Sequence, residues 1–197
     1  MESCRKQTSP NSNSQNTTID NYSGVWPNMT AFNNKLRCRG YQPIPACSLF
    51  VPTISKSLIR QKQNTGACGP VNLVGYSLGA TNSVKLARTL GESGIEVDHL
   101  ILIEPFDHPV IPGNVRHCLN IYESRPTDRL NIFKGTAATA ESPQTALHNL
   151  NISNSTEWAA LRVNNHFTIA TDPRVQRFLA SQLPMLDQTS ETCSIQR

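Results

Sequence analysis

One serine stands in a setting that favours nucleophilic chemistry. Ser77 is the centre of the pentapeptide Gly-Tyr-Ser-Leu-Gly at 75–79, with a short apolar run at 71–74 before it and a helical pattern of apolar residues at 78–90 after it. A strand that enters a helix directly through Gly-x-Ser-x-Gly makes a sharp turn and exposes the serine at its tip. The N–H groups at the start of the helix favour developing negative charge, so the N–H of Leu78 is a candidate oxyanion donor. The alternative is a tight glycine-rich turn whose serine is incidental.

A serine hydroxyl is a weak nucleophile and needs a base, normally a histidine that a carboxylate orients. Where the serine occupies such a turn, the acid and then the histidine follow it in the chain. His148 and His166 both lie late in this chain. We prefer His166, because it follows the stretch 158–163, interpreted as the last strand, and precedes the final helix. No predicted strand precedes His148.

Four carboxylates are candidates for the orienting acid. Glu104 ends the predicted strand after the nucleophile helix, and Asp107 lies three residues further on. Glu123 ends the following predicted strand, and Asp128 lies in the loop behind it. Each could reach a histidine at the carboxyl edge of the sheet, so these residues by themselves leave the choice open.

Strand and helix signals alternate along the chain. The apolar runs at 71–74, 100–103 and 117–122 are typical of buried parallel strands, and a proline-containing strand at 41–49 is expected near a sheet edge. Asp172, followed by a proline, is expected to cap the final helix. This order predicts an α/β fold with a mostly parallel sheet of about five to six strands and helices on both faces.

The composition predicts one folded domain and excludes several classes of function. We assign residues 19–185 to the domain, between a disordered polar tail at 1–18 and a flexible C-terminal tail at 186–197. The formal charge of +4 is mild and the basic residues are scattered, so nucleic acid is not an expected partner. No stretch reaches the roughly 18–20 apolar residues of a membrane helix.

Neither metal nor cofactor is expected. No Cys/His cluster has the spacing of zinc ligands, and most of the six cysteines are interpreted as small buried hydrophobic residues. The N-terminus lacks the apolar segment of a secretory signal. The chain as written is therefore expected in the cytoplasm, or as a secreted or periplasmic protein if the natural N-terminus lies upstream.

Four segments of the chain carry a resemblance to a known family. They are Val-Asn-Leu-Val-Gly-Tyr-Ser-Leu-Gly-Ala (71–80), Val-Asp-His-Leu-Ile-Leu-Ile-Glu-Pro (97–105), Pro-Gly-Asn-Val-Arg-His-Cys-Leu-Asn-Ile-Tyr (112–122) and Asn-His-Phe-Thr-Ile-Ala-Thr-Asp-Pro-Arg-Val (165–175). Together they resemble small bacterial α/β-hydrolases that are lipase- or thioesterase-like. The resemblance implies an α/β-hydrolase-like fold with a catalytic triad, in which Ser77 is the nucleophile and His166 the base. Many lipases of this fold carry their acid in an Asp-Pro pair at the position of Glu104-Pro105, which favours Glu104 as the acid.

The first strand departs from this family pattern. Members usually have an apolar strand directly before the oxyanion loop, but the matching stretch at 17–24 contains only two large apolar residues. Either the strand is degraded, or this minimal domain lacks part of the N-terminal sheet. The second oxyanion N–H is expected from Gly24 or its neighbours Ser23 and Val25.

The sequence therefore predicts a metal-free serine hydrolase that cleaves a carboxylic ester or thioester through an acyl-enzyme intermediate. Ser77 would attack the acyl carbon, His166 would carry the proton and Glu104 would orient the imidazole. The alternative is a non-catalytic or degenerate binding protein that has kept the α/β-hydrolase fold, and the polar first strand favours that alternative.

Overall fold

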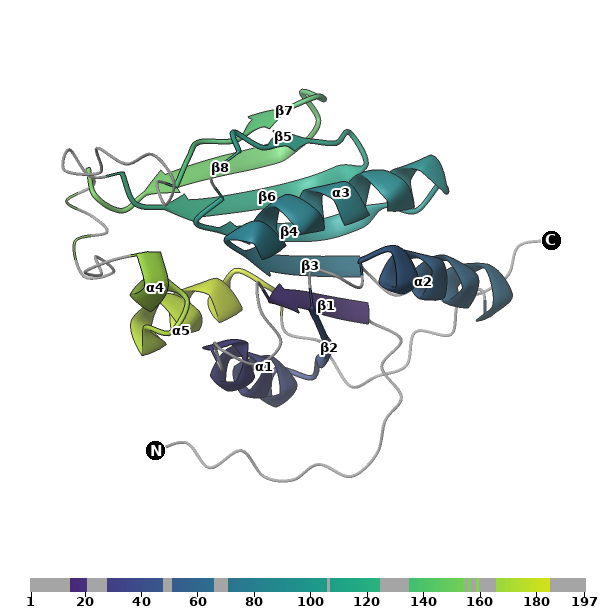
Figure 1. Cartoon of the computed structure of the whole chain (residues 1–197), viewed down its shortest axis with the longest axis horizontal. Coiled ribbons are helices and arrows are strands. Elements are labelled where there is room, and N and C mark those ends of the chain that lie inside the picture. The colour runs from purple at the N-terminus through teal and green to yellow at the C-terminus, as the bar shows by residue number, and fades with distance from the viewer. Residues whose placement is uncertain are drawn as a thin grey trace.

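A parallel sheet forms the centre of the molecule (Figure 1). The computed structural model describes residues 15–20, 28–47, 51–65, 71–105, 107–124, 135–154, 156, 159 and 166–184. The strand order of its six-stranded sheet is β2-β1-β3-β4-β6-β8, and every neighbouring pair is parallel. The strands are β1 (Gln15–Asp20), β2 (Gln42–Cys47), β3 (Val71–Tyr76), β4 (Val97–Ile103), β6 (Val115–Tyr122) and β8 (Ala146–Asn151). Two short strands, β5 (Val110–Ile111) and β7 (Thr139–Ala140), form a separate parallel pair.

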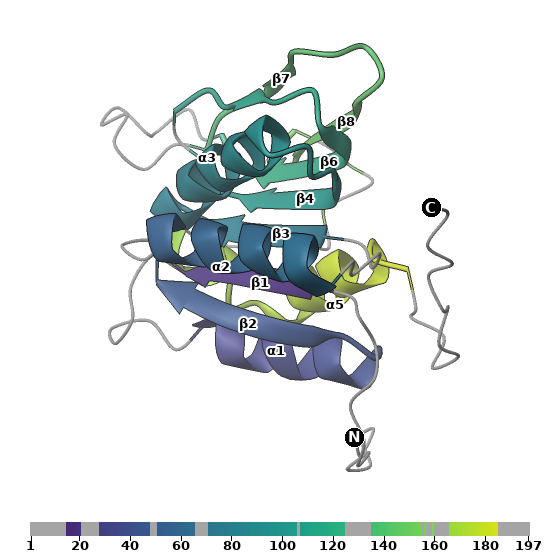
Figure 2. The same cartoon turned by 90° about the vertical axis from the view of Figure 1, so that its right-hand side faces the viewer.

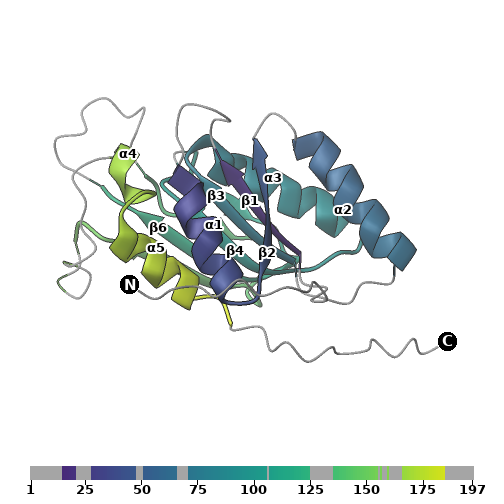
Figure 3. The ribbon, with the colours of Figure 1, turned by 90° about the horizontal axis from the view of Figure 1, so that it is seen from below.

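Helices cover both faces of the sheet, as the sequence predicts (Figures 2 and 3). One face carries α1 (Asn28–Cys38) and α5 (Pro173–Ser181), and the other carries α2 (Val51–Thr65) and α3 (Leu78–Glu92). A short helix, α4 (His166–Ile169), precedes α5. The α5 helix begins where the sequence predicts, because the Asp172 carboxylate accepts a hydrogen bond from the N–H of Arg174.

The central strands are buried on both sides, so their residues alternate between two cores. In β3, Val74 packs into the core under α1 and α5, whereas Leu73 packs into the core under α2 and α3. In β4, Ile101 and Leu100 divide in the same way. Successive side chains of a strand point to opposite faces, which is why a continuous apolar run is needed here. The carboxyl ends of β3 and β4 are thereby held side by side.

The polar N-terminal strand β1 lies inside the sheet and not at its edge. β1 pairs with β2 on one side and with β3 on the other, and Thr17 lies in register with Ile44 and Leu73. The expectation of a disordered tail through residue 18 is therefore wrong for residues 15–18, which belong to β1. Pairing with two neighbours supplies the backbone hydrogen bonds of this strand despite its few apolar residues.

The two edges of the sheet are β2 and β8. The edge position of β2 is the one predicted from its prolines, Pro43 and Pro45, which cannot donate to a ladder. The sequence does not predict β8, because its exposed Ala146, His148 and Asn149 break the apolar pattern of a buried strand. The stretch at 158–163, interpreted from sequence as the last strand, lies outside the described residues except for one position, as does the C-terminal tail at 186–197.

Two further observations bear on the sequence predictions. Cys38 is disulfide-bonded, whereas Cys118 is free and buried, which agrees for that residue with the interpretation of most cysteines as small buried hydrophobic residues. Within the described ranges, no helix combines the length and the apolar character that crossing a membrane requires.

Candidate active site

The turn between β3 and α3 presents Ser77 in a strained conformation. Its φ of 56° and ψ of −121° lie outside the regions that L-residues usually adopt. The Ser77 N–H donates to the carbonyl of Ile103 (2.8 Å), which ties the turn to the end of β4. Gly75 must be a glycine, because a Cβ there would lie 2.3 Å from the carbonyl oxygen of Gly79. The local sequence therefore forms the tight strand–helix turn that the pentapeptide predicts.

His166 faces the hydroxyl of this serine. It is the first residue of α4, and its Nε2 lies 3.0 Å from the Oγ of Ser77. The two residues are 89 positions apart in the chain, and both are buried. This distance is within the range in which a base can accept the proton of a nucleophile.

Glu104 lies on the other side of the imidazole. Its Oε2 is 3.2 Å from the Nδ1 of His166, and its Oε1 accepts a hydrogen bond from the backbone N–H of Glu123. Glu104 directly follows β4 and has a φ of 54°, so a non-glycine residue adopts the left-handed region here. Burial raises the pKa of the Glu104 carboxyl, and the hydrogen bonds from His166 and from the Glu123 amide oppose that rise.

The structure describes two of the other three carboxylate candidates. Asp107 is exposed and accepts a hydrogen bond from the Thr81 hydroxyl (3.0 Å). Glu123 is buried, and its backbone N–H is the group that contacts Glu104. Asp128 lies outside the described residues. Among the candidates that the structure describes, Glu104 is the one with a recorded side-chain contact to His166.

The other predicted site residues are the two oxyanion donors and the second histidine. Leu78 is the first residue of α3, as an oxyanion donor after the nucleophile should be, and its side chain is exposed. Gly24, with its neighbours Ser23 and Val25, lies outside the described residues. His148, the less favoured histidine, is exposed on the edge strand β8.

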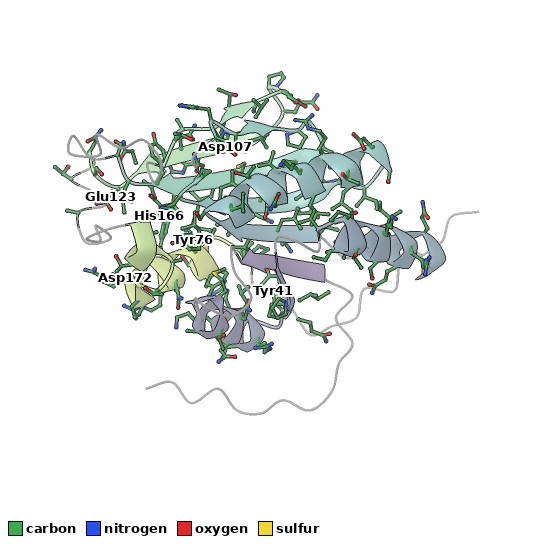
Figure 4. The ribbon with its side chains drawn as sticks, in the orientation of Figure 1. Tyr41, Tyr76, Asp107, Glu123, His166 and Asp172 are labelled. Atoms are coloured by element: carbon green, nitrogen blue, oxygen red, sulfur yellow. The ribbon has the colours of Figure 1, made fainter. Side chains whose placement is uncertain are left out.

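The structure adds two residues to this site that sequence reasoning missed. The hydroxyl of Tyr76 donates to the backbone carbonyl of His166 (2.9 Å), and the two rings pack with centroids 5.3 Å apart. Figure 4 shows both side chains, with Glu123, at one end of the sheet. Gly135 packs so closely on Glu104 that a Cβ there would lie 2.9 Å from its Oε1. The sequence could have indicated Tyr76, because it is a large aromatic residue between a glycine and the nucleophile. Nothing in the sequence distinguishes Gly135.

Taken together, the three side chains form a continuous hydrogen-bonded series from Ser77 through His166 to Glu104. Such a series can deprotonate a hydroxyl and stabilise the imidazolium that results. Among the described residues, no group of three or more His, Cys, Asp or Glu side chains is placed to hold a metal ion.

Comparison with known proteins gives a likeness of fold. No family model and no curated protein matches the chain. The RedJ thioesterase of prodiginine biosynthesis from Streptomyces coelicolor is 10% identical, with a TM-score of 0.50 over 88% of this chain and 87% of RedJ. The NocB thioesterase domain from the nocardicin cluster is 12% identical, with a TM-score of 0.51 over 86% of this chain and 91% of the other.

A lipase gives a similar result. Aspergillus fumigatus lipase B is 11% identical, with a TM-score of 0.56 over 85% of this chain, which spans about half of the lipase (51%). RedJ has also been seen with a polyethylene glycol molecule in its active site. At these identities the likeness concerns the fold alone. The chain has an α/β-hydrolase-like fold that resembles those of thioesterases and a lipase.

Proposed function

We propose that this protein is a serine hydrolase that cleaves a carboxylic ester or thioester through an acyl-enzyme intermediate. The observation that carries the proposal is the series of contacts in which His166 Nε2 lies 3.0 Å from Ser77 Oγ and its Nδ1 lies 3.2 Å from Glu104 Oε2. The three residues come from the ends of different elements. His166 lies 62 positions after Glu104 and 89 positions after Ser77 in the chain. An incidental serine in a glycine-rich turn does not account for a buried histidine and a buried carboxylate aligned behind it.

In the first half of the proposed reaction, Ser77 Oγ attacks the acyl carbon while His166 Nε2 takes the hydroxyl proton. The carbonyl oxygen becomes an oxyanion, which the N–H of Leu78 and a second N–H, assigned to Gly24 or a neighbour, would stabilise. His166 then gives its proton to the leaving alcohol or thiol, and the bond from the acyl carbon to that group breaks. The acyl group remains on Ser77 as an ester.

In the second half, water replaces the leaving group. His166 takes one proton from the water as its oxygen attacks the acyl carbon, and then returns that proton to Ser77 Oγ as the acyl-enzyme bond breaks. The products are a free acid and the original enzyme. Glu104 acts in both halves, because a carboxylate at Nδ1 holds the imidazole in the tautomer that leaves Nε2 free to accept a proton.

The proteins of similar fold support acyl esters and thioesters as the substrate class. They include two thioesterases and a lipase, and these substrates share one chemistry, attack on an activated acyl carbon. The exposed apolar side chain of Leu78, directly after the nucleophile, is consistent with an apolar acyl group.

Labelling with a fluorophosphonate probe tests the nucleophile. The wild-type protein should be labelled and Ser77→Ala should not, whereas Ser55→Ala should be labelled like the wild type. Ser55 is a matched control, because it is also buried and its hydroxyl donates to a backbone carbonyl, that of Pro52 on α2. Labelling of folded Ser77→Ala at the wild-type rate would exclude Ser77 as the reactive group.

Hydrolysis of short p-nitrophenyl esters and of short acyl thioesters tests the reaction itself. We expect Ser77→Ala to lower kcat by about 10³-fold or more, because the nucleophile of a triad is removed. The ratio of kcat/KM for the two substrate series would show which class the enzyme prefers.

A non-catalytic binding protein is the second candidate. The polar composition of β1, a central strand of the sheet, favours it, since the oxyanion loop follows that strand in the family pattern. A folded protein that resists the probe and hydrolyses neither substrate series would support this candidate and contradict the hydrolase.

A further inference from the structure

We propose that Tyr76 is a positioning residue that holds His166 in place for reaction with Ser77. The inference rests on the proposed hydrolase function, because the group that Tyr76 positions is the proposed base. It concerns a residue that lies next to the nucleophile but makes its contacts to the histidine 90 positions away.

Tyr76 contacts His166 in two ways. Its hydroxyl donates to the backbone carbonyl of His166 (2.9 Å), and its ring lies against the imidazole at a centroid separation of 5.3 Å and an interplanar angle of 31°. The first contact fixes the main chain from which the imidazole extends. The second restricts the volume in which the ring can turn.

These contacts can hold His166 in place because Tyr76 is itself anchored in the central sheet. Tyr76 is the last residue of β3, is 2% exposed, and belongs to the core under α1 and α5. Its backbone is paired with Ile103 of β4, so the side chain starts from the rigid centre of the sheet. Groups that must be held within a fraction of an ångström are best supported by such rigid elements.

His166 needs this support more than Ser77 does. Ser77 is tied to the sheet by its own N–H, which donates to Ile103, and by the start of α3. His166 begins α4, a helix of four residues, which is too short to be stable by its own hydrogen bonds. Two adjacent residues at the end of β3 thus contact the same histidine. The Ser77 hydroxyl lies against Nε2 of His166, and the Tyr76 hydroxyl donates to the backbone carbonyl of His166.

The test compares Tyr76→Phe with Tyr41→Phe. Tyr41 is a matched control, because it is equally buried and its hydroxyl also donates to a backbone carbonyl, that of Pro184. Figure 4 shows Tyr41 well away from Tyr76 and His166. Each variant removes one buried hydroxyl and keeps the ring, so each should lower the thermal midpoint by a similar amount.

Only Tyr76→Phe should affect the reaction. We expect its kcat for a p-nitrophenyl ester to fall by about tenfold or more at an almost unchanged KM, because a misplaced base slows chemistry and the buried hydroxyl donates to the main chain of His166. Tyr41→Phe should keep kcat within about twofold of the wild type. Equal kcat values for the two folded variants would overturn the proposal, and so would a Tyr76→Phe variant that fails to fold, because the hydroxyl would then serve folding rather than positioning.

A spectroscopic readout separates this inference from the proposed function. The imidazole N–H proton of His166 can be followed by NMR and assigned by its loss in His166→Gln. Its exchange with water should be about tenfold faster or more in Tyr76→Phe than in the wild type or in Tyr41→Phe, because a mobile ring loses its hydrogen bonds. An unchanged exchange rate contradicts the positioning role. If the wild-type protein lacks hydrolysis that depends on Ser77, the proposed function fails, and the exchange rate still decides the role of Tyr76.

Discussion

At the scale of single residues, Glu104 carries two costs that a structural carboxylate would avoid. Its side chain is 2% exposed, and its backbone adopts a φ of 54°. A residue held in a sparsely populated region of φ/ψ typically costs about 1–3 kcal/mol, and such residues cluster at functional sites. The conformation turns the residue after β4 back toward Glu123 and His166, where its carboxylate is bonded from both sides.

The raised pKa of Glu104 gives a prediction about stability and pH. Burial is its main cause, so the folded state holds the proton more tightly than the unfolded chain, whose pKa has the ordinary value of 4.5. The stability contribution of this group is therefore present below pH 4.5 and is lost as the pH rises through the higher folded value. Glu104→Gln removes this titration. The thermal midpoint of the wild type, relative to that of Glu104→Gln, should fall as the pH rises from 4 to 8, and a relative midpoint that rises instead would contradict the assignment.

Among the candidate acids, Glu104 should be the one whose substitution lowers kcat most. We expect Glu104→Gln to lower kcat by more than Asp107→Asn or Asp128→Asn does. Asp107 is exposed and bonded to Thr81, so its loss should change kcat by no more than a few-fold, whereas loss of a triad carboxylate costs about 10⁴-fold. Steady-state kinetics of the three variants decides the point, and a larger fall in either aspartate variant would reassign the acid.

At the scale of elements, the stretch that leads into β7 approaches the site closely at Gly135. A Cβ at Gly135 would lie 2.6 Å from the Cβ of Tyr122 and 2.9 Å from the Oε1 of Glu104. Gly135→Ala should therefore displace the carboxylate and destabilise the protein by about 1–3 kcal/mol, the usual cost of overpacking. Denaturant unfolding and kcat measure the two effects.

Gly113→Ala is the matched control for this substitution. Among the described residues, a Cβ there would meet the side chain of Ser142 alone, at an ordinary contact distance of 3.5 Å. We expect near wild-type stability and activity from this variant. If Gly135→Ala behaves like Gly113→Ala, the packing against Glu104 is looser than the contact distances imply.

The sequence predicts best the positions of those strands that are buried on both faces. β3, β4 and β6 appear as apolar runs because both sides of each strand meet a core, and the α5 boundary follows from its Asp-Pro cap. β8 lacks this signal because an edge strand exposes one side, and β1 lacks it because its place in the sheet depends on pairing partners far along the chain. Ser77 is predicted from its pentapeptide and His166 from chain order. The residues alone leave four acids open, and only the family resemblance favours Glu104, because the choice depends on which strand ends are neighbours.

At the scale of the whole molecule, β1 is the expected weak point of the sheet. It lies between β2 and β3, but its sequence, Gln-Asn-Thr-Thr-Ile-Asp, contains one large apolar residue. β3 in the same sheet is buried along its entire length. Because local opening follows the apolar area that a segment buries, backbone amides of β1 should exchange at least about tenfold faster than those of β3. Hydrogen exchange followed by mass spectrometry measures both, and equally slow exchange in the two strands would show that pairing alone stabilises β1.

The prolines of β2 have a consequence for how these molecules meet one another. Pro43 and Pro45 are two positions apart on an edge strand, so both direct their main-chain groups to the same side of it. Since neither has an N–H to donate, one side of β2 lacks a hydrogen-bond donor at both positions. Prolines are among the devices by which edge strands resist pairing with a second sheet, and β2 carries two of them.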